Sequence, residues 1–61
     1  MDPNQTLKEI QLDITSHTLN EFTDMACSDL WEWIRDGGFE PEWRAYPLGT
    51  EYYKEWKRQN A

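Results

Sequence analysis

Residues 29–43, DLWEWIRDGGFEPEW, decide the fold of this 61-residue chain. Three of its four tryptophans lie in this stretch. The first half spaces its apolar residues as a helix does, and Gly37-Gly38 then offers the left-handed residue with which many helices end. Phe39 and Trp43 follow closely enough to fold back on that helix. The stretch therefore predicts the end of an amphipathic helix, a tight turn and an aromatic core.

The helix that ends at these glycines is predicted to span residues 18–36. Thr18 and Glu21 have the spacing of a capping box, in which each side chain bonds to the backbone amide of the other residue. The apolar residues that follow share one face of a helical wheel. They are Leu19, Phe22, Ala26, Leu30, Trp33 and Ile34.

An N-terminal helix is predicted over residues 3–14. Asp2 can cap it, and Pro3 suits the first helical position, where no backbone N–H is needed. Apolar residues then recur at helical spacing, at Leu7, Ile10 and Ile14. Apolar and polar residues also alternate over residues 10–15, which is typical of a strand. We favour the helix because no other segment offers a strand partner.

The C-terminal segment completes an all-α prediction for one small domain, residues 1–61. Pro41 can begin a short helical turn, and residues 47–49 are predicted to form a loop. Thr50 can then cap an aromatic helix over residues 50–59, on which Tyr52 and Trp56 are spaced to stack. We expect the first two helices to form an antiparallel hairpin that this last helix closes.

The net charge of −6 is unevenly distributed. Residues 1–42 carry ten acids against two bases, whereas residues 43–61 carry two acids against four bases. An acidic body repels the phosphates of nucleic acids and favours basic partners. The sequence has neither a signal peptide nor an apolar run of about 20 residues, so a soluble, cytoplasmic protein without membrane contact is expected.

No pattern predicts catalysis, a cofactor or a metal. Cys27 is the only cysteine, and the acids near it predict a buried, unreactive thiol. Asp13, His17 and Glu21 could converge on a metal if one helix carried all three. The capping signals at residues 16–18 predict that the helix is broken there, so we expect a non-enzymatic protein with no cofactor.

The candidate contact surface lies on the helix over residues 18–36. Trp31 and Met25 fall outside its apolar face, and an exposed tryptophan is typical of a binding hot spot. Three acids of the same helix complete the candidate set, Asp24, Glu32 and Asp36. Two interpretations of Trp31 remain open, because it can be free for a partner or covered by Trp43, Tyr46 or the final helix.

Two short motifs carry a resemblance to a known family. The first is MDPN followed by Thr6, Leu7 and Ile10, and the second is Trp33-Ile34, Gly37 to Phe39, Pro41 and Trp43. In these motifs the chain resembles short open reading frames of actinobacteria and their phages, which have no assigned activity. The resemblance implies a small accessory protein of phage or mobile-element type. The aromatic tail after Ala45 departs from the usual ending of that family.

Three hypotheses of function follow. The first is a protein-binding module that modulates or inhibits a host protein in the host cytoplasm. The second is an acidic DNA mimic, because the five carboxylates from Glu21 to Asp36 are spaced about 4–5 Å apart along a helix, near the roughly 3.4 Å phosphate spacing of a DNA strand. The third is a structural homo-oligomer, for which a homodimer is the simplest form. Direct nucleic acid binding is not expected.

Overall fold

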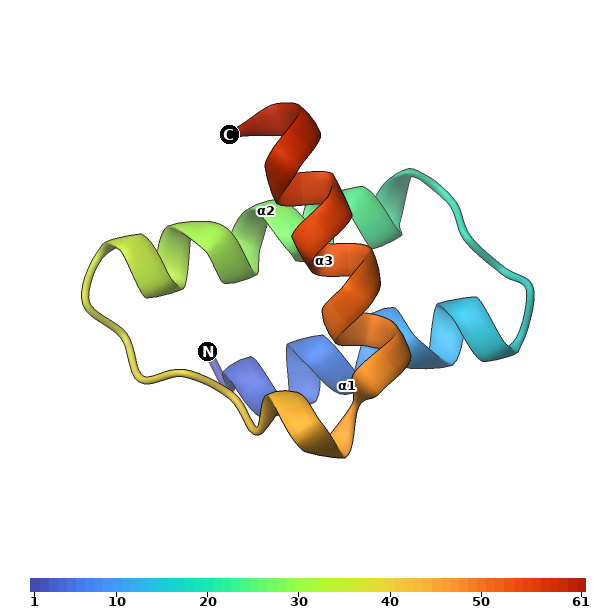
Figure 1. Cartoon of the computed structure of the whole chain (residues 1–61), viewed down its shortest axis with the longest axis horizontal. Coiled ribbons are helices and arrows are strands. Elements are labelled where there is room, and N and C mark those ends of the chain that lie inside the picture. Colours follow the sequence, from blue (N-terminus) through green and yellow to red (C-terminus); the bar gives the residue numbers. More distant parts are fainter.

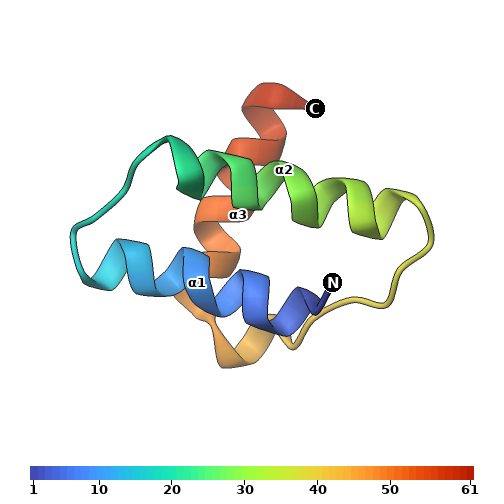
Figure 2. The same cartoon turned by 180° about the vertical axis from the view of Figure 1, so that it is seen from behind.

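The computed structural model describes residues 1–61 as three α-helices and one 3₁₀ turn, without strands. The elements are α1 (Pro3–Thr15), α2 (Glu21–Arg35), η1 (Trp43–Ala45) and α3 (Pro47–Asn60). α1 and α2 run antiparallel, and α3 crosses both on one side, as Figures 1 and 2 show from opposite directions. The predicted all-α hairpin closed by a C-terminal helix is confirmed, and residues 10–15 are helical. None of the helices is both long and apolar enough to cross a membrane.

α1 begins as its sequence predicts. The Asp2 side chain accepts a hydrogen bond from the backbone N–H of Asn4 at 3.0 Å, and Pro3 occupies the first turn, fully buried. The helix ends at Thr15, and His17, two residues later, has a φ of 56° in the left-handed region that turns the chain away. The predicted break between the first two helices is therefore present.

α2 begins two residues later than the predicted capping box requires. The Asn20 side chain accepts from the N–H of Phe22 at 2.7 Å, and the Thr23 hydroxyl accepts from the N–H of Asn20. The predicted pair of Thr18 and Glu21 is wrong, because the N–H of Thr18 still bonds to Asp13 O at the end of α1. The Thr23 hydroxyl also donates to the Asp13 carboxylate at 2.7 Å, so the cap of α2 is tied to α1.

The buried face of α2 differs from the predicted one. Its fully buried residues are Thr23, Cys27 and Leu30, whereas Phe22, predicted to lie in the core, is 66% exposed. Leu19 is half exposed as well. The face is turned toward Thr23 and Cys27 because α2 packs against two helices, α1 and α3, rather than against one.

The core draws on all three helices. Its buried apolar side chains are Leu7, Ile10, Cys27, Leu30 and Tyr53. Only these five apolar side chains, with the smaller groups around them, fill the centre of a molecule that measures 31 × 23 × 17 Å. Packing of partly exposed aromatic rings against this centre therefore contributes much of the interior.

The glycine turn forms as predicted, but Phe39 after it stays outside the core, whereas Pro41 is buried and Trp43 packs against the core. Gly37 has a φ of 94° and ends α2. The ring nitrogen of Trp33 donates to Phe39 O at 2.9 Å, and the two rings meet edge to face. Phe39 itself is 61% exposed, so its predicted place in the core is wrong. The chain then returns to α1, where the N–H of Glu42 donates to the Asn4 side chain at 2.7 Å.

α3 begins at Pro47, three residues before the predicted start. The Gln11 side-chain oxygen on α1 accepts from the N–H groups of Leu48 and Gly49, at 3.0 and 3.2 Å. This oxygen takes the place of a local cap, so residues 47–49 are helical and not a loop. The Thr50 hydroxyl instead donates to Trp43 O.

The aromatic residues of α3 divide between two neighbours. Tyr53 is stacked on Trp43 with ring centroids 5.5 Å apart, and Trp56 is stacked on Tyr53 at 6.4 Å. Tyr52 points to α2, so the predicted stack of Tyr52 on Trp56 is replaced by the one on Tyr53. The three stacked rings join η1 to α3.

Candidate functional site

The predicted contact residues lie on two different sides of α2. Met25, Glu32 and Asp36 are seven and eleven residues apart, which places them within about 40° of one another on a helical wheel. Asp24 and Trp31 lie about 100° and 120° away from Met25, where Asp24 accepts from Tyr52 of α3 and Trp31 packs against the core. The structure therefore does not unite the five residues in one surface.

Trp31 is partly covered. Its ring is half-buried and packs against the core, and the Arg35 guanidinium lies 4.6 Å from the ring centroid. Arg35 also contacts the Asp36 carboxylate at 3.5 Å. The sequence left open whether Trp31 is free for a partner or covered by the rest of the chain. The second interpretation describes it better, but Arg35 and the core cover the ring.

The side of α2 that faces away from both other helices is called here the outer face of α2. It consists of Phe22, Met25, Asp29, Glu32 and Asp36, all exposed. Phe22 and Met25 are neighbours at i,i+3 and are 66% and 57% exposed. Neither of them packs against the core. Phe22 was missed as a surface residue because it fits the apolar periodicity of the helix; the alternative stripe of Thr23, Cys27 and Leu30 was the signal for the true face.

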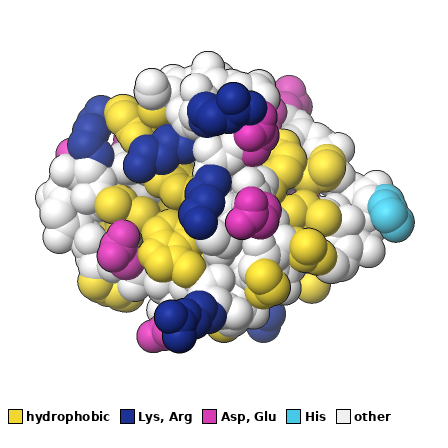
Figure 3. Space-filling model, viewed as in Figure 1, with side chains coloured by type: hydrophobic (Ala, Val, Ile, Leu, Met, Phe, Trp, Pro, Cys, Tyr) yellow, Lys and Arg dark blue, Asp and Glu magenta, His cyan; other side chains and the backbone are white.

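The charges are divided between two sides of the molecule. Figure 3 shows dark-blue Lys and Arg side chains gathering over α3 on the face seen there. Three bases, Lys54, Lys57 and Arg58, come from α3, and Arg44 comes from η1. The outer face of α2 carries three acids and no base. The excess of acidic side chains therefore belongs to the part of the chain that precedes η1 and α3.

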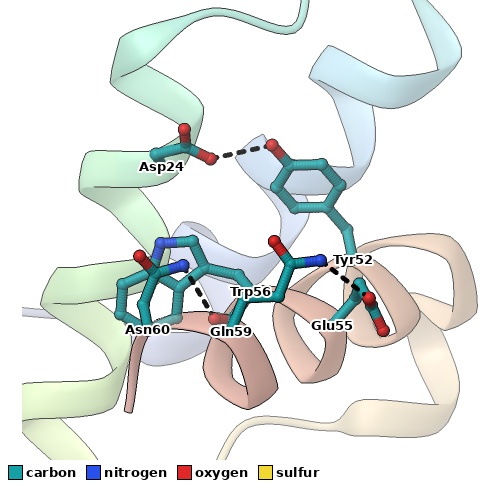
Figure 4. Close-up of a pocket in the computed structure, with 6 residues that line it drawn as sticks. All are labelled: Asp24, Tyr52, Glu55, Trp56, Gln59 and Asn60. Carbon is teal, nitrogen blue, oxygen red and sulfur yellow. Dashed lines mark hydrogen bonds between the residues drawn. The ribbon is translucent and has the colours of Figure 1, made fainter.

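A pocket of about 240 Å³ lies between α2 and α3, and we call it the α2–α3 pocket. Asp24 enters it from α2, and five residues of α3 complete its lining (Figure 4): Tyr52, Glu55, Trp56, Gln59 and Asn60. The Tyr52 hydroxyl donates to the Asp24 carboxylate at 2.8 Å. Partial burial, followed by this hydrogen bond, raises the pKa of Tyr52 to about 12.

The two acids of this pocket differ in their surroundings. Glu55 accepts hydrogen bonds from Arg58 and Gln59, and these bonds lower its pKa. The ion pairs of the chain join Arg58 to Glu55 and Arg35 to Asp36. Asp24 is thus the acid of the pocket that has no base beside it.

The side chains that the sequence offered for reactivity or metal binding are either buried, exposed alone or engaged in a structural hydrogen bond. Cys27 is fully buried, and burial followed by the charge of Asp24 raises the pKa of its thiol from 9.0 to about 12. His17 is exposed in the turn after α1, and Asp13 holds Thr23. No group of three or more His, Cys, Asp or Glu side chains converges as metal ligands would.

The two motifs that carry the family resemblance meet in space, since Asn4 of the first accepts from Glu42 beside Pro41 of the second. Comparisons with protein-family models, curated proteins and solved structures gave no match to this chain. The resemblance to phage-type reading frames stays a prediction. Function is therefore inferred from the geometry of the surface and the pocket.

Proposed function

We propose that the chain is a non-enzymatic protein-binding module and that the outer face of α2 is its contact surface. The observation that carries this proposal is the exposed pair Phe22 and Met25, on a helix whose remaining sides pack against α1 and α3. Adjacent apolar side chains of this size gain about 25 cal/mol for each Å² that a partner covers. Clustered apolar exposure of this kind is typical of interaction sites.

The charge of the same face defines the chemistry of the partner. Asp29, Glu32 and Asp36 continue the face toward the C-terminal end of α2. A complementary partner presents an apolar recess bordered by basic side chains, because opposite charges accelerate encounter and exclude wrong partners. In line with the family resemblance, we propose that binding modulates or inhibits a host protein.

An acidic DNA mimic is the second candidate. The observation in its favour is that Glu21, Asp29 and Glu32 are exposed and unpaired along one helix. Two of the five acids in the proposed charge row are engaged, Asp24 by Tyr52 and Asp36 by Arg35. The exposed pair Phe22 and Met25, and the small number of unpaired acids, favour the protein-binding module.

The test begins with affinity capture from a host lysate and identification of the partner by mass spectrometry. The partner is then titrated with the wild type and with the double variant Phe22→Ala/Met25→Ala, which should bind at least tenfold more weakly, since hot-spot truncations cost about 1.4 kcal/mol or more. Leu12→Ala is the matched control, because Leu12 is 50% exposed on α1 and lies outside the proposed surface. Unchanged affinity of the double variant contradicts the proposal.

Salt separates the two candidates. Affinity of a DNA mimic falls steeply with rising salt, because its binding depends on charge. An interface anchored by Phe22 and Met25 keeps most of its affinity, since apolar burial is not screened. The DNA mimic is supported if affinity falls steeply with salt and Phe22→Ala/Met25→Ala binds the partner as tightly as the wild type does.

A further inference from the structure

We propose that the α2–α3 pocket binds one basic side chain of the partner, and that an arginine fits it best. The inference rests on the proposed protein-binding function, because the basic side chain belongs to that partner. It adds a second contact point, on the other side of α2 from Phe22. Asp24 directly precedes Met25 in the chain, but their side chains point about 100° apart around α2, so the partner has to reach round the helix to contact both the pocket and the outer face.

The carboxylate of Asp24 is prepared for a cation. The Tyr52 hydroxyl donates to one of its oxygens and fixes its orientation, while no base of the chain pairs with it. A carboxylate offers about four lone-pair positions, so one hydrogen bond leaves most of its acceptor capacity unused. A guanidinium can bond to such a carboxylate with two parallel N–H groups.

The remaining lining consists of acceptors and an aromatic ring. The side-chain nitrogen of Gln59 donates to Glu55 at 2.8 Å, and that of Asn60 donates to Trp56 O at 2.9 Å. Each amide group therefore uses one of its two N–H groups inside the chain and keeps its oxygen free to accept. The half-buried indole of Trp56 lines the same pocket (Figure 4), and an indole face attracts a cation electrostatically.

Size and polarity indicate a single side chain. The volume of about 240 Å³ is below the range of roughly 300–1,000 Å³ that drug-sized ligands occupy. Carboxylate, amide oxygens and an aromatic face together suit a group that only donates hydrogen bonds and carries positive charge. Arginine meets these requirements better than lysine, because its planar fork can bond to the carboxylate and stack on the ring.

The pocket can be tested without the partner. Full-length protein labelled with ¹⁵N is titrated with N-acetyl-arginine amide and, separately, with N-acetyl-citrulline amide, which has nearly the same shape but no charge. We expect the arginine compound to shift the backbone signal of Asp24 and the indole N–H signal of Trp56, and the citrulline compound to leave them in place. Equal shifts with both compounds, or shifts elsewhere on the surface, overturn the proposal.

Two variants complete the test. Asp24→Asn can still accept from Tyr52, so the helix packing is retained while the charge is removed; arginine affinity should fall about fivefold, as expected for an exposed charge pair. Glu9→Gln removes an exposed acid of α1 that lies outside both the pocket and the outer face of α2, so it is the matched control and should bind as the wild type does. If Asp24→Asn binds the arginine compound as the wild type does, the pocket proposal is overturned. If the arginine compound does not bind but Phe22→Ala/Met25→Ala still loses the captured partner, the pocket proposal fails and the proposed function stands.

Discussion

At the scale of single residues, two helices of this chain end in the same way with different residues. After α2, Gly37 and Gly38 donate to Ile34 O and Trp33 O. After α1, His17 and Thr18 repeat the same two spacings. Gly37 has a φ of 94° and His17 a φ of 56°, so a histidine stands where a residue without Cβ is preferred.

This comparison predicts opposite effects of two substitutions. His17→Gly removes the left-handed strain of a residue with a Cβ and should raise the free energy of unfolding by about 0.5–1 kcal/mol. Gly37→Ala introduces that strain and should lower it by about 1 kcal/mol, although nothing lies within 4 Å of the added methyl group. Urea denaturation measures both. A shift of the same sign in the two variants contradicts the explanation.

Three further residues, Cys27, Tyr52 and Tyr53, link stability to alkaline pH, because burial raises the pKa of each. Burial above all raises the pKa of Cys27 from 9.0 to about 12 and that of Tyr52 from 10.0 to about 12. The unfolded chain therefore releases these protons at lower pH than the folded chain. Their contribution to stability is complete below about pH 9 and decreases as the pH rises toward 12.

We accordingly expect the urea midpoint to fall between about pH 8 and about pH 11, in the direction that proton release by the unfolded state requires. Cys27→Ala should flatten part of this fall, and Tyr52→Phe should flatten another part. Lys54→Gln is a suitable control, because it changes an exposed base without removing any of the three groups. A midpoint that is constant over this pH range in the wild type excludes all three contributions.

At the scale of helices, the crossing of α1 and α3 depends on Gly49 and Gln11. Gln11 supplies the acceptor that begins α3, and Gly49 is buried against the backbone of α1. A Cβ on Gly49 would lie 2.9 Å from Leu7 O and 3.2 Å from the backbone nitrogen of Gln11. The glycine therefore permits a close approach of two helices.

Gly49→Ala tests this crossing because two effects have opposite signs. Greater helix propensity would stabilise α3 by about 1 kcal/mol. The contact with rigid backbone of α1 should outweigh it and give a net loss of about 1–3 kcal/mol in the free energy of unfolding. Leu48→Ala, at an exposed neighbouring position, is the matched control and should change little. A more stable Gly49→Ala protein contradicts the close approach.

At the scale of the whole molecule, α3 is part of the core and also carries the bases. Tyr53 is one of the five buried apolar side chains, and α3 contacts both α1 and α2. The aromatic tail after Ala45 is thus a structural element. It also carries Lys54, Lys57 and Arg58, three of the six bases of the chain, a concentration that the net charge of −6 does not reveal.

Truncation separates the structural role of α3 from any role of the last residues. A chain of residues 1–46 leaves one side of Leu7, Ile10 and Leu30 uncovered and should show no cooperative thermal transition by circular dichroism. A chain of residues 1–58 loses only Gln59, Asn60 and Ala61, which are exposed, and should still unfold cooperatively. Cooperative unfolding of the 1–46 chain would show that the hairpin is stable alone.

Part of the candidate site could be predicted from the sequence. Met25, Glu32 and Asp36 lie on one exposed face, as their spacing indicates, whereas Asp24 lies in the α2–α3 pocket. Trp31 is half-buried, and the exposure of Phe22 was not predicted. A helical wheel gives the angle of each residue, but it does not show that a third helix buries a second side of α2.

The sequence by itself determined the three helices, the cap at Asp2, the break near His17 and the stop at Gly37. Each of these signals acts within about five residues, where spacing and backbone preference are sufficient. Only the tertiary structure decided which face of α2 is buried, where α3 begins and which residues form the pocket. Those features depend on pairs distant in the chain, such as Gln11 with Gly49 and Asp24 with Tyr52, 38 and 28 residues apart. No local pattern encodes such pairs, because the crossing of the helices brings them together.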